Sequence, residues 1–480
     1  MSLSRTLKFF AVVIALLAIL CIVLPEDGVR VAGTTIRMPS LHKVLVREKE
    51  RDIDELLAKP VERDLTGIRD SILDCRYVTA ESQYRFWLPN DDVSFFDNFF
   101  KQAESAVKKH RIIRVLHYGD SQIEQDRISC RLRSRLQREF GGGGPGMLPF
   151  RQPIPTLTIN QSAKGDIHGQ APYGDSTYSR NGNYGPMLRS WHLGGFAGMS
   201  VSRKNSMYAD SCAGSFSSVR LLFNNRGNQL SVSMKNRKGA GSYYNKVNQP
   251  GIGVVSWNLD TVTSSVCIDV RGNADLYGVM VDNGYGVAVD NISMRGVSGH
   301  QFKKTKLEQL TDSYKLMDVG MIIMQFGGNS MSYLVNERSI NKYCEDMGAQ
   351  IDYLRLACPD VTILFVGPSD MSTTKNGRRT SYKQIPEVVE KLRKTVNEHG
   401  AAYWSIYDAM GGFESMVSWV NNKLAGNDYT HFTVKGAILM GDCLSDALLK
   451  MYELYKLRKQ ITPIQFNKLW KDEETTLSSQ

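Results

Sequence analysis

The sequence predicts an α/β fold in which a parallel sheet lies between two layers of helices and is interrupted by a β-rich insert. Short, almost uniformly apolar runs alternate with helical patterns, which is typical of a parallel sheet covered on both faces. The first of these runs is separated from the next by a segment of different composition, rich in Gly, Ser, Asn and Tyr. The chain has 480 residues, more than one ordinary core organises, so an additional folded unit is expected.

Several apolar runs are expected to form the strands of the parallel sheet. They occupy residues 111–117, 286–290, 321–326, 361–366 and 401–406. Helical patterns occupy residues 93–109, 341–357 and 385–399, and a last helix is expected to begin near Thr433. Because helices alternate with the buried strands, the sequence predicts a three-layer α/β/α domain.

The segment 150–285 is expected to be a β-sandwich-like insert. Its short alternating runs, separated by turn residues, occupy 217–223, 230–234 and 265–270. Aromatic side chains in this segment could stack against sugar rings or could belong to its core, and both interpretations stay open. These side chains are Trp191, Tyr208, Tyr243, Tyr244 and Trp257.

The N-terminus carries an export or membrane signal. Arg5 and Lys8 precede an uncharged apolar run at 9–24, which is followed by Pro25. No small-x-small cleavage site closes the run, which favours an uncleaved transmembrane anchor over a cleaved signal peptide. Positive charge before the run places the bulk of the chain outside the cytoplasm.

The sequence therefore divides into six segments. They are an anchor or signal segment (1–25), a stalk or linker with a helix at 44–57 (26–88), the first part of the α/β domain (89–149), the insert with possible carbohydrate binding (150–285), the second part of the α/β domain (286–460) and a C-terminal tail (461–480).

Composition excludes several classes of protein. The hydrophobic share of 42% and the charged share of 22% are ordinary for a globular protein and exclude wholesale disorder. The net charge of +10 comes from scattered Lys and Arg without interleaved aromatic residues, so no nucleic-acid partner is expected. The cysteines show no C-x-x-C or metal-ligand spacing, so neither a metal nor a cofactor is expected; Cys212 with Cys267 is the one disulfide considered.

A candidate nucleophile lies where the first apolar run ends. The run leads into Gly119-Asp120-Ser121, and an amphipathic helix pattern follows. A strand that delivers a serine to the edge of a sheet, with a helix beginning behind it, exposes the hydroxyl and points backbone N–H groups at the same place. Ser121 is therefore the residue around which a reactive site is expected.

Three later segments supply the groups that a nucleophilic serine needs: a base with an orienting carboxylate, and donors for the oxyanion. Asp428 and His431, three residues apart before the last helix, can place a carboxylate beside one ring nitrogen and leave the other for Ser121. Asn329 follows an apolar strand, so its amide is expected near the serine at the carboxyl edge of the sheet. Gly296 or Gly299, also after a strand, allows a backbone N–H to approach a substrate.

These motifs resemble the four blocks of the SGNH hydrolase superfamily, the GDSL-type esterases and lipases. The blocks are matched, in the family's order, by Gly119-Asp120-Ser121, Val297-Ser298-Gly299, Gly327-Gly328-Asn329 and Asp428-Tyr429-Thr430-His431. Two positions depart from the family pattern: Gln122 stands where Leu is expected, and Ser330 where Asp often follows the Asn.

The resemblance implies an SGNH, flavodoxin-like fold and a role for each matched residue. Ser121 would be the nucleophile, His431 the general base and Asp428 the group that orients the base. The oxyanion would be held by the N–H groups of Ser121 and Gly299 and by the side chain of Asn329. The choice of Gly299 over Gly296 stays open.

The long insert and the form His-Tyr-Gly-Asp-Ser-Gln are similar to exported bacterial members that act on O-acetyl groups of peptidoglycan or other polysaccharides. The resemblance therefore implies a serine acetylesterase of the periplasm or cell envelope, with an acetylated glycan as its partner. Two alternatives stay open: a polysaccharide O-acetyltransferase using the same site, and a non-catalytic glycan-binding envelope protein.

Overall fold

The structure is a computed structural model that describes residues 3–23, 29–31, 34–36, 66–79, 82–174, 176–208, 214–227, 229–236 and 242–471. The chain forms two compact units, Met1–Leu65 and Thr66–Gln480. Each unit is considered by itself.

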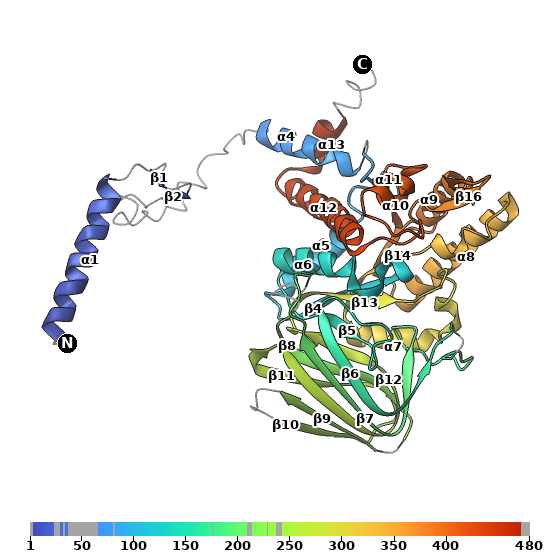
Figure 1. Cartoon of the computed structure of the whole chain (residues 1–480), viewed down its shortest axis with the longest axis horizontal. Helices are drawn as coiled ribbons and strands as arrows, with labels where there is room; N and C mark the ends of the chain where they lie inside the picture. Colours follow the sequence, from blue (N-terminus) through green and yellow to red (C-terminus); the bar gives the residue numbers. More distant parts are fainter. Residues whose placement is uncertain are drawn as a thin grey trace. The chain divides into compact units, whose positions relative to one another are not determined.

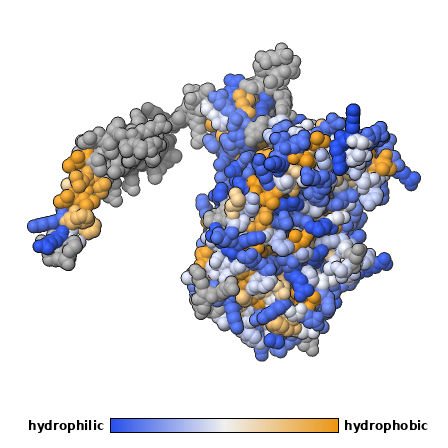
Figure 2. Space-filling view, in the orientation of Figure 1, coloured by the Kyte–Doolittle hydropathy of each residue, from blue (hydrophilic) through white to orange (hydrophobic). Residues whose placement is uncertain are grey.

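The first unit contains helix α1 (Leu3–Val23) and a small antiparallel pair, β1 (Val29–Val31) and β2 (Thr34–Ile36). Apolar side chains line much of α1 (Figure 2). A membrane anchor was expected here from the sequence, but no helix within the described ranges has the length and apolar character needed to span a bilayer. The helix expected at 44–57 lies outside the described residues.

The second unit is organised around a six-stranded sheet with the order β13-β4-β14-β15-β18-β3 (Figure 1). The first five of these strands run parallel, and the short edge strand β3 runs antiparallel to β18. Their bounds are β3 (Phe86–Trp87), β4 (Ile112–Gly119), β13 (Gly286–Ser293), β14 (Val319–Gln325), β15 (Thr362–Val366) and β18 (Ala402–Trp404). Each expected strand of the parallel sheet is therefore present.

Helices cover both faces of this sheet. Successive side chains of a strand point to opposite faces, so each strand contributes to the core on both sides. On β4, Ile113 and Val115 pack on one side into a core shared with α5 (Asp97–Ala106), α6 (Ser129–Phe140) and α12 (Val434–Arg458). Leu116 and Tyr118 pack on the other side into a core shared with α7 (Leu307–Met317), α8 (Glu337–Ala357) and α9 (Ile385–Glu398). The predicted three-layer α/β/α fold is confirmed.

Shorter elements complete the α/β domain. They are α4 (Thr66–Asp74), η1 (Arg76–Val78), η2 (Pro89–Asp91), η4 (Phe302–Lys304), η5 (Gly328–Ser330), α10 (Ile406–Ala409), α11 (Ser415–Asn421), α13 (Pro463–Lys471) and the hairpin of β16 (Ser372–Lys375) and β17 (Arg378–Ser381). Around the Asn376-Gly377 turn, both central residues have positive φ, which suits the tight hairpin.

The insert between β4 and β13 is an eight-stranded antiparallel sheet, drawn below the central sheet in Figure 1. Its strands are β5 (Gly146–Leu148), β6 (Ile159–Gln170), β7 (Ser190–Arg203), β8 (Phe216–Asn225), β9 (Leu230–Asn236), β10 (Ser242–Val247), β11 (Gly251–Thr263) and β12 (Ser265–Asp282). The first half of β12 pairs with β7 and β9, and its second half pairs with β8 and β5. One long strand, β12, thus joins the strands of the insert into a single antiparallel sheet.

A buried charge cluster links the insert to the α/β domain. The guanidinium of Arg114 on β4 donates to Asp290 on β13, 2.6 Å away, and to Asp282 at the end of β12. Arg220 on β8 also reaches Asp282, at 3.2 Å. The side chains of Arg114 and both aspartates are fully buried, so removal of one partner would leave an uncompensated charge in the interior.

Candidate active site

The segment after β4 forms a 3-10 turn, η3 (Ser121–Asp126), before α6 begins at Ser129. The helix predicted behind the serine, with apolar positions at Leu132, Leu136 and Phe140, is confirmed as α6, and the 3-10 turn separates it from Ser121. Gln125 and Asp126 adopt positive φ values of 61° and 66°, which interrupts helical geometry. The turn directs the Asp126 carboxylate to Arg133, at 2.6 Å, and to the Thr158 hydroxyl, at 2.8 Å. These buried bonds offset the cost of the strained backbone.

Ser121, His431 and Asp428 lie in a continuous hydrogen-bonded chain. The distance from Ser121 Oγ to His431 Nε2 is 2.7 Å, and that from His431 Nδ1 to Asp428 Oδ2 is 2.8 Å. Both distances fall within ordinary hydrogen-bond range. The arrangement leaves His431 able to accept the serine proton while the carboxylate fixes the ring's orientation.

The carboxylate of Asp428 is stabilised in its ionised form. Burial raises its pKa, but hydrogen bonds from the backbone N–H and ring of His431 and from the backbone N–H of Thr430 outweigh burial, and the pKa lies below its ordinary value. Both backbone N–H groups donate to Oδ1 at 3.0 Å. Asp428 is therefore negatively charged at neutral pH and supports a developing imidazolium.

Asn329 follows β14, the strand beside β4, as expected for the carboxyl edge of a parallel sheet. Its Nδ2 donates to Val297 O at 3.0 Å and lies 3.3 Å from Asp120 Oδ2. Asp120 Oδ1 accepts from the backbone N–H of Gln122 at 2.9 Å. Asp120 thus connects the serine loop to the asparagine loop.

The pKa of Asp120 is raised to about 6, chiefly by burial, which the hydrogen bond from the Gln122 N–H and the nearby His431 partly offset. A carboxyl group with this pKa changes its charge in mildly acidic solution. The orientation of Asn329 is therefore coupled to a titratable neighbour.

The two candidate oxyanion glycines differ in their surroundings. Gly299 has a φ of +99°, and a Cβ atom there would lie 2.8 Å from Met347 Sδ and 3.2 Å from the Phe326 ring. Gly296 also has positive φ, but a Cβ there would meet no atom within 4 Å. The backbone conformation favours glycine at both positions, but only at 299 would a side chain also clash with its neighbours.

Sequence reasoning missed two features beside the site. Glu124, which is buried, accepts two hydrogen bonds from Arg295 at 2.8 and 2.7 Å, so the serine loop is tied to the segment that carries the two glycines. The β16–β17 hairpin places the Arg379 guanidinium 4.4 Å from the centre of the Tyr429 ring, between Asp428 and His431 in sequence. The Asn376-Gly377 pair could have revealed the hairpin.

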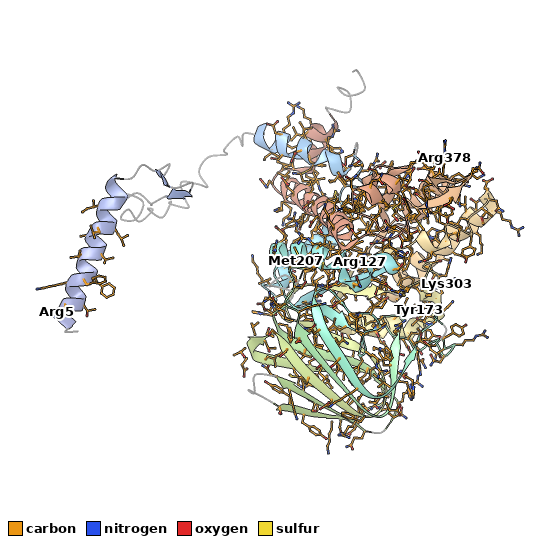
Figure 3. All side chains as sticks on the ribbon, viewed as in Figure 1. Arg5, Arg127, Tyr173, Met207, Lys303 and Arg378 are labelled. Carbon is orange, nitrogen blue, oxygen red and sulfur yellow. The ribbon has the colours of Figure 1, made fainter. Side chains whose placement is uncertain are left out.

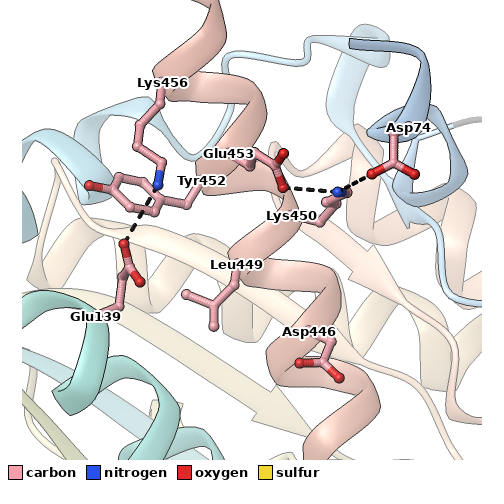
Figure 4. Close-up of a pocket in the computed structure, with 8 residues that line it drawn as sticks. All are labelled: Asp74, Glu139, Asp446, Leu449, Lys450, Tyr452, Glu453 and Lys456. Carbon is pink, nitrogen blue, oxygen red and sulfur yellow. Dashed lines mark hydrogen bonds and ion pairs between the residues drawn. The ribbon is translucent and has the colours of Figure 1, made fainter. Parts of the chain in front are cut away.

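A pocket of about 680 Å³ lies elsewhere in the second unit (Figure 4). Its lining consists of Asp74, Glu139, Asp446, Leu449, Lys450, Tyr452, Glu453 and Lys456. Lys450 pairs with Asp74 and Glu453, and Lys456 pairs with Glu139. Since its lysines are neutralised by carboxylates, this pocket is a surface ion-pair network. Within the described part of the chain, no group of three or more His, Cys, Asp or Glu residues could hold a metal ion.

The aromatic residues of the insert have different exposures. Trp191 and Trp257 are buried in the core of the insert, and Tyr243 packs against that core. Tyr244 is 62% exposed on β10, and Tyr208 is partly buried. Tyr244 is therefore the best placed of the five to meet a ligand. Cys267 is a free thiol, whereas Cys212 lies outside the described residues.

No protein-family model and no curated protein sequence matches the chain. Among solved structures, the chain is similar to a peptidoglycan O-acetylesterase, with 19% identity, a TM-score of 0.60, and coverage of 75% of this chain and 96% of that one. A family two carbohydrate esterase from Cellvibrio japonicus matches at 10% identity with a TM-score of 0.26, covering 62% of this chain and 99% of that one.

A GDSL-like lipase from Parabacteroides merdae matches at 15% identity with a TM-score of 0.25, covering 34% of this chain and 74% of that one. Neither of the two low TM-scores carries an argument, whereas the first likeness, with its TM-score of 0.60, supports a shared fold. The chain is therefore similar in fold to the peptidoglycan O-acetylesterase, and its own fold is an α/β/α domain with an additional antiparallel sheet.

Proposed function

We propose that the chain is a serine esterase that removes O-acetyl groups from a cell-wall or other polysaccharide. The observation that carries the proposal is the hydrogen-bonded chain of Ser121, His431 and Asp428, with separations of 2.7 and 2.8 Å. The likeness in fold to a peptidoglycan O-acetylesterase supports acetylated glycan as the substrate class.

The proposed reaction has two steps. Ser121 Oγ attacks the acetyl carbonyl carbon while His431 Nε2 takes the hydroxyl proton. The sugar oxygen then leaves with that proton, and the acetyl group stays on the serine. A water molecule, deprotonated by His431, attacks the acyl-enzyme and releases acetate and free Ser121.

The charge that develops on the carbonyl oxygen needs donors on the serine loop and its neighbours. We assign this role to the N–H groups of Ser121 and Gly299 and to the Asn329 amide. The two hydrogens of that amide are directed to Val297 O and, in a longer bond, to Asp120 Oδ2, so donation to the oxyanion replaces one of these two bonds. Loss of one such donor typically costs about 10²–10³ in kcat.

The test uses an acetyl ester reporter and acetylated cell-wall glycan, with acetate release as the readout. Ser121→Ala and His431→Ala are expected to lower kcat by about 10⁴-fold or more, and Asn329→Ala to leave a measurable remnant. A Ser121→Ala protein with full activity would contradict the serine mechanism. Acetyl transfer to a supplied glycan hydroxyl, exceeding acetate release, would identify the O-acetyltransferase instead.

We also propose that the chain acts outside the cytoplasm, where such glycans lie. Arg5 and Lys8 precede the apolar residues of α1, an order typical of export signals. Fractionation of cells producing the full chain tests this: recovery in the periplasm or envelope is expected, and recovery in the cytoplasm alone would contradict it.

A further inference from the structure

Gln122, the residue that departs from the GDSL pattern, bridges the serine loop and the histidine loop. It directly follows Ser121, and it is buried. Its Nε2 donates to Thr430 O at 2.7 Å, and its Oε1 accepts from the Phe432 N–H at 3.2 Å. Thr430 and Phe432 are the two neighbours of His431, so a single carboxamide holds the backbone on both sides of the base.

Arg127, which is labelled in Figure 3, forms a second bridge between the same loops. Its guanidinium donates to Ser121 O at 2.5 Å and to Phe432 O at 2.8 Å. Its Nε donates to Glu124 O at 3.0 Å. The two bridges connect segments that lie far apart in the chain: Gln122 and Thr430 are separated by 308 residues.

The base itself is not held by burial. The side chain of His431 is 40% exposed and that of Asp428 is 52% exposed. Bonds within the loop, such as Gly426 N–H to His431 O at 2.7 Å, shape it but do not fix its distance from Ser121. That distance depends on groups that span both loops.

We propose that Gln122 is a positioning residue that keeps His431 Nε2 within hydrogen-bond reach of Ser121 Oγ; the inference rests on the proposed esterase function. The geometry requires a group that donates on one side and accepts on the other, and a carboxamide does both. Leucine does neither. An ionised glutamate would turn an oxygen toward the Thr430 carbonyl, whereas a protonated glutamate again donates and accepts.

The experiment compares the wild-type chain with Gln122→Leu and Gln122→Glu on the acetyl ester reporter. Gln122→Leu is expected to lower kcat by about 10- to 100-fold with KM nearly unchanged, because a small misplacement of a catalytic group costs rate more than binding. The rate at which a fluorophosphonate labels Ser121 is expected to fall in step, since it reports the same serine–histidine pair.

The pH dependence separates positioning from simple destabilisation. The ratio of Gln122→Glu to wild-type kcat is expected to rise as the pH falls, because the buried glutamate becomes protonated and regains its donor. The corresponding ratio for Gln122→Leu is expected to be independent of pH. Thermal unfolding of each variant shows that the comparison is made on folded protein.

Gln309 provides a matched control. It is also buried and also both donates and accepts, to Asn183 Oδ1 at 2.6 Å and from Tyr277 OH at 3.0 Å, but its partners lie away from the catalytic loops. Gln309→Leu is expected to lower the melting temperature without lowering kcat. A Gln309→Leu loss of kcat equal to that of Gln122→Leu would overturn the positioning role.

The outcomes distinguish this inference from the proposed function. A wild-type chain without Ser121-dependent turnover would contradict the esterase function. An active wild type whose kcat and labelling rate are matched by folded Gln122→Leu would contradict the role of Gln122. If Gln122→Leu does not fold, the Gln122→Glu variant gives the test. A ratio of Gln122→Glu kcat to wild-type kcat that stays constant with pH would then contradict the positioning role of Gln122.

Discussion

The α/β domain and the insert bury their polar groups in different ways. In the α/β domain, Asp120, Ser121 and Gln122 are buried together at the carboxyl edge of the sheet, and they bond to loops that carry other candidate catalytic groups. In the insert, buried Asp275 and Asp282 are each paired with arginine. The first arrangement positions candidate catalytic groups, and the second holds structural elements together. Mutations in the first are therefore expected to lower activity, and mutations in the second to lower stability.

Among the variants that separate activity from stability, the largest expected effect belongs to Asp428→Asn. Loss of the carboxylate removes the group that fixes the His431 ring, and kcat is expected to fall by about 10⁴-fold. Because the Asp428 side chain is 52% exposed, the melting temperature should change little. Steady-state kinetics on the acetyl ester reporter, with thermal unfolding alongside, measures both quantities.

A similar pair in the insert serves as the control for that variant. Asp166 lies 3.2 Å from His168 Nε2, and its side chain is 74% exposed. Asp166→Asn is expected to leave kcat unchanged. Equal losses of kcat in the two variants would show that the Asp428 effect is not specific to the triad.

The next effect is on stability. Arg114→Met leaves Asp282 and Asp290 buried without their shared partner, and removal of one member of a buried pair typically costs about 3–5 kcal/mol. The free energy of unfolding should fall by that amount, while kcat of the folded fraction stays close to wild type. Denaturant unfolding followed by kinetics tests both statements.

Arg111, three residues earlier, is the matched comparison. Its pair with Asp318 spans 2.8 Å, but the two side chains are 56% and 36% exposed. Arg111→Met is therefore expected to cost about 1 kcal/mol or less. Equal destabilisation by the two substitutions would contradict the view that burial of the charge cluster around Arg114 determines the loss of unfolding free energy.

The strands and helices of the α/β domain were predictable because burial on both faces makes their sequences uniformly apolar. The apolar run of 361–366, for example, became β15 (Thr362–Val366). Strand β6 was not identified individually, because the Ile159–Gln170 strand is largely polar and partly exposed. The two-residue edge strand β3 is too short to give a periodic signal.

The residues of the candidate site were predictable as a set, but their cross-links were not. Ser121, Asn329 and His431 each follow a local pattern of strand end or turn. The bridge from Gln122 to Thr430 and Phe432 is a contact between distant segments, and no local spacing encodes it. The positive φ values of Gln125 and Asp126 were missed for the same reason, since they are imposed by tertiary bonds to Arg133 and Thr158.

A smaller effect than that of Arg114→Met is expected from the pH dependence of His117, which lies on β4. Its ring is fully buried, with Nε2 3.0 Å from Gln325 Oε1 and Nδ1 2.9 Å from Ser129 Oγ. Burial lowers the pKa of His117 from 6.5 to about 4, against the hydrogen bond to Gln325, which raises it. The unfolded chain therefore binds this proton more readily than the folded chain.

Because the folded pKa lies below the unfolded one, the contribution of neutral His117 is complete above about pH 6.5 and is lost as the pH falls toward about 4. The loss amounts to about 3 kcal/mol at most. His117→Gln should remove it, so the difference in unfolding free energy between wild type and variant should shrink with falling pH. Taking this difference cancels the opposite contribution of Asp120, whose pKa is raised to about 6. A difference for His117→Gln that stays constant with pH would contradict a buried, neutral ring.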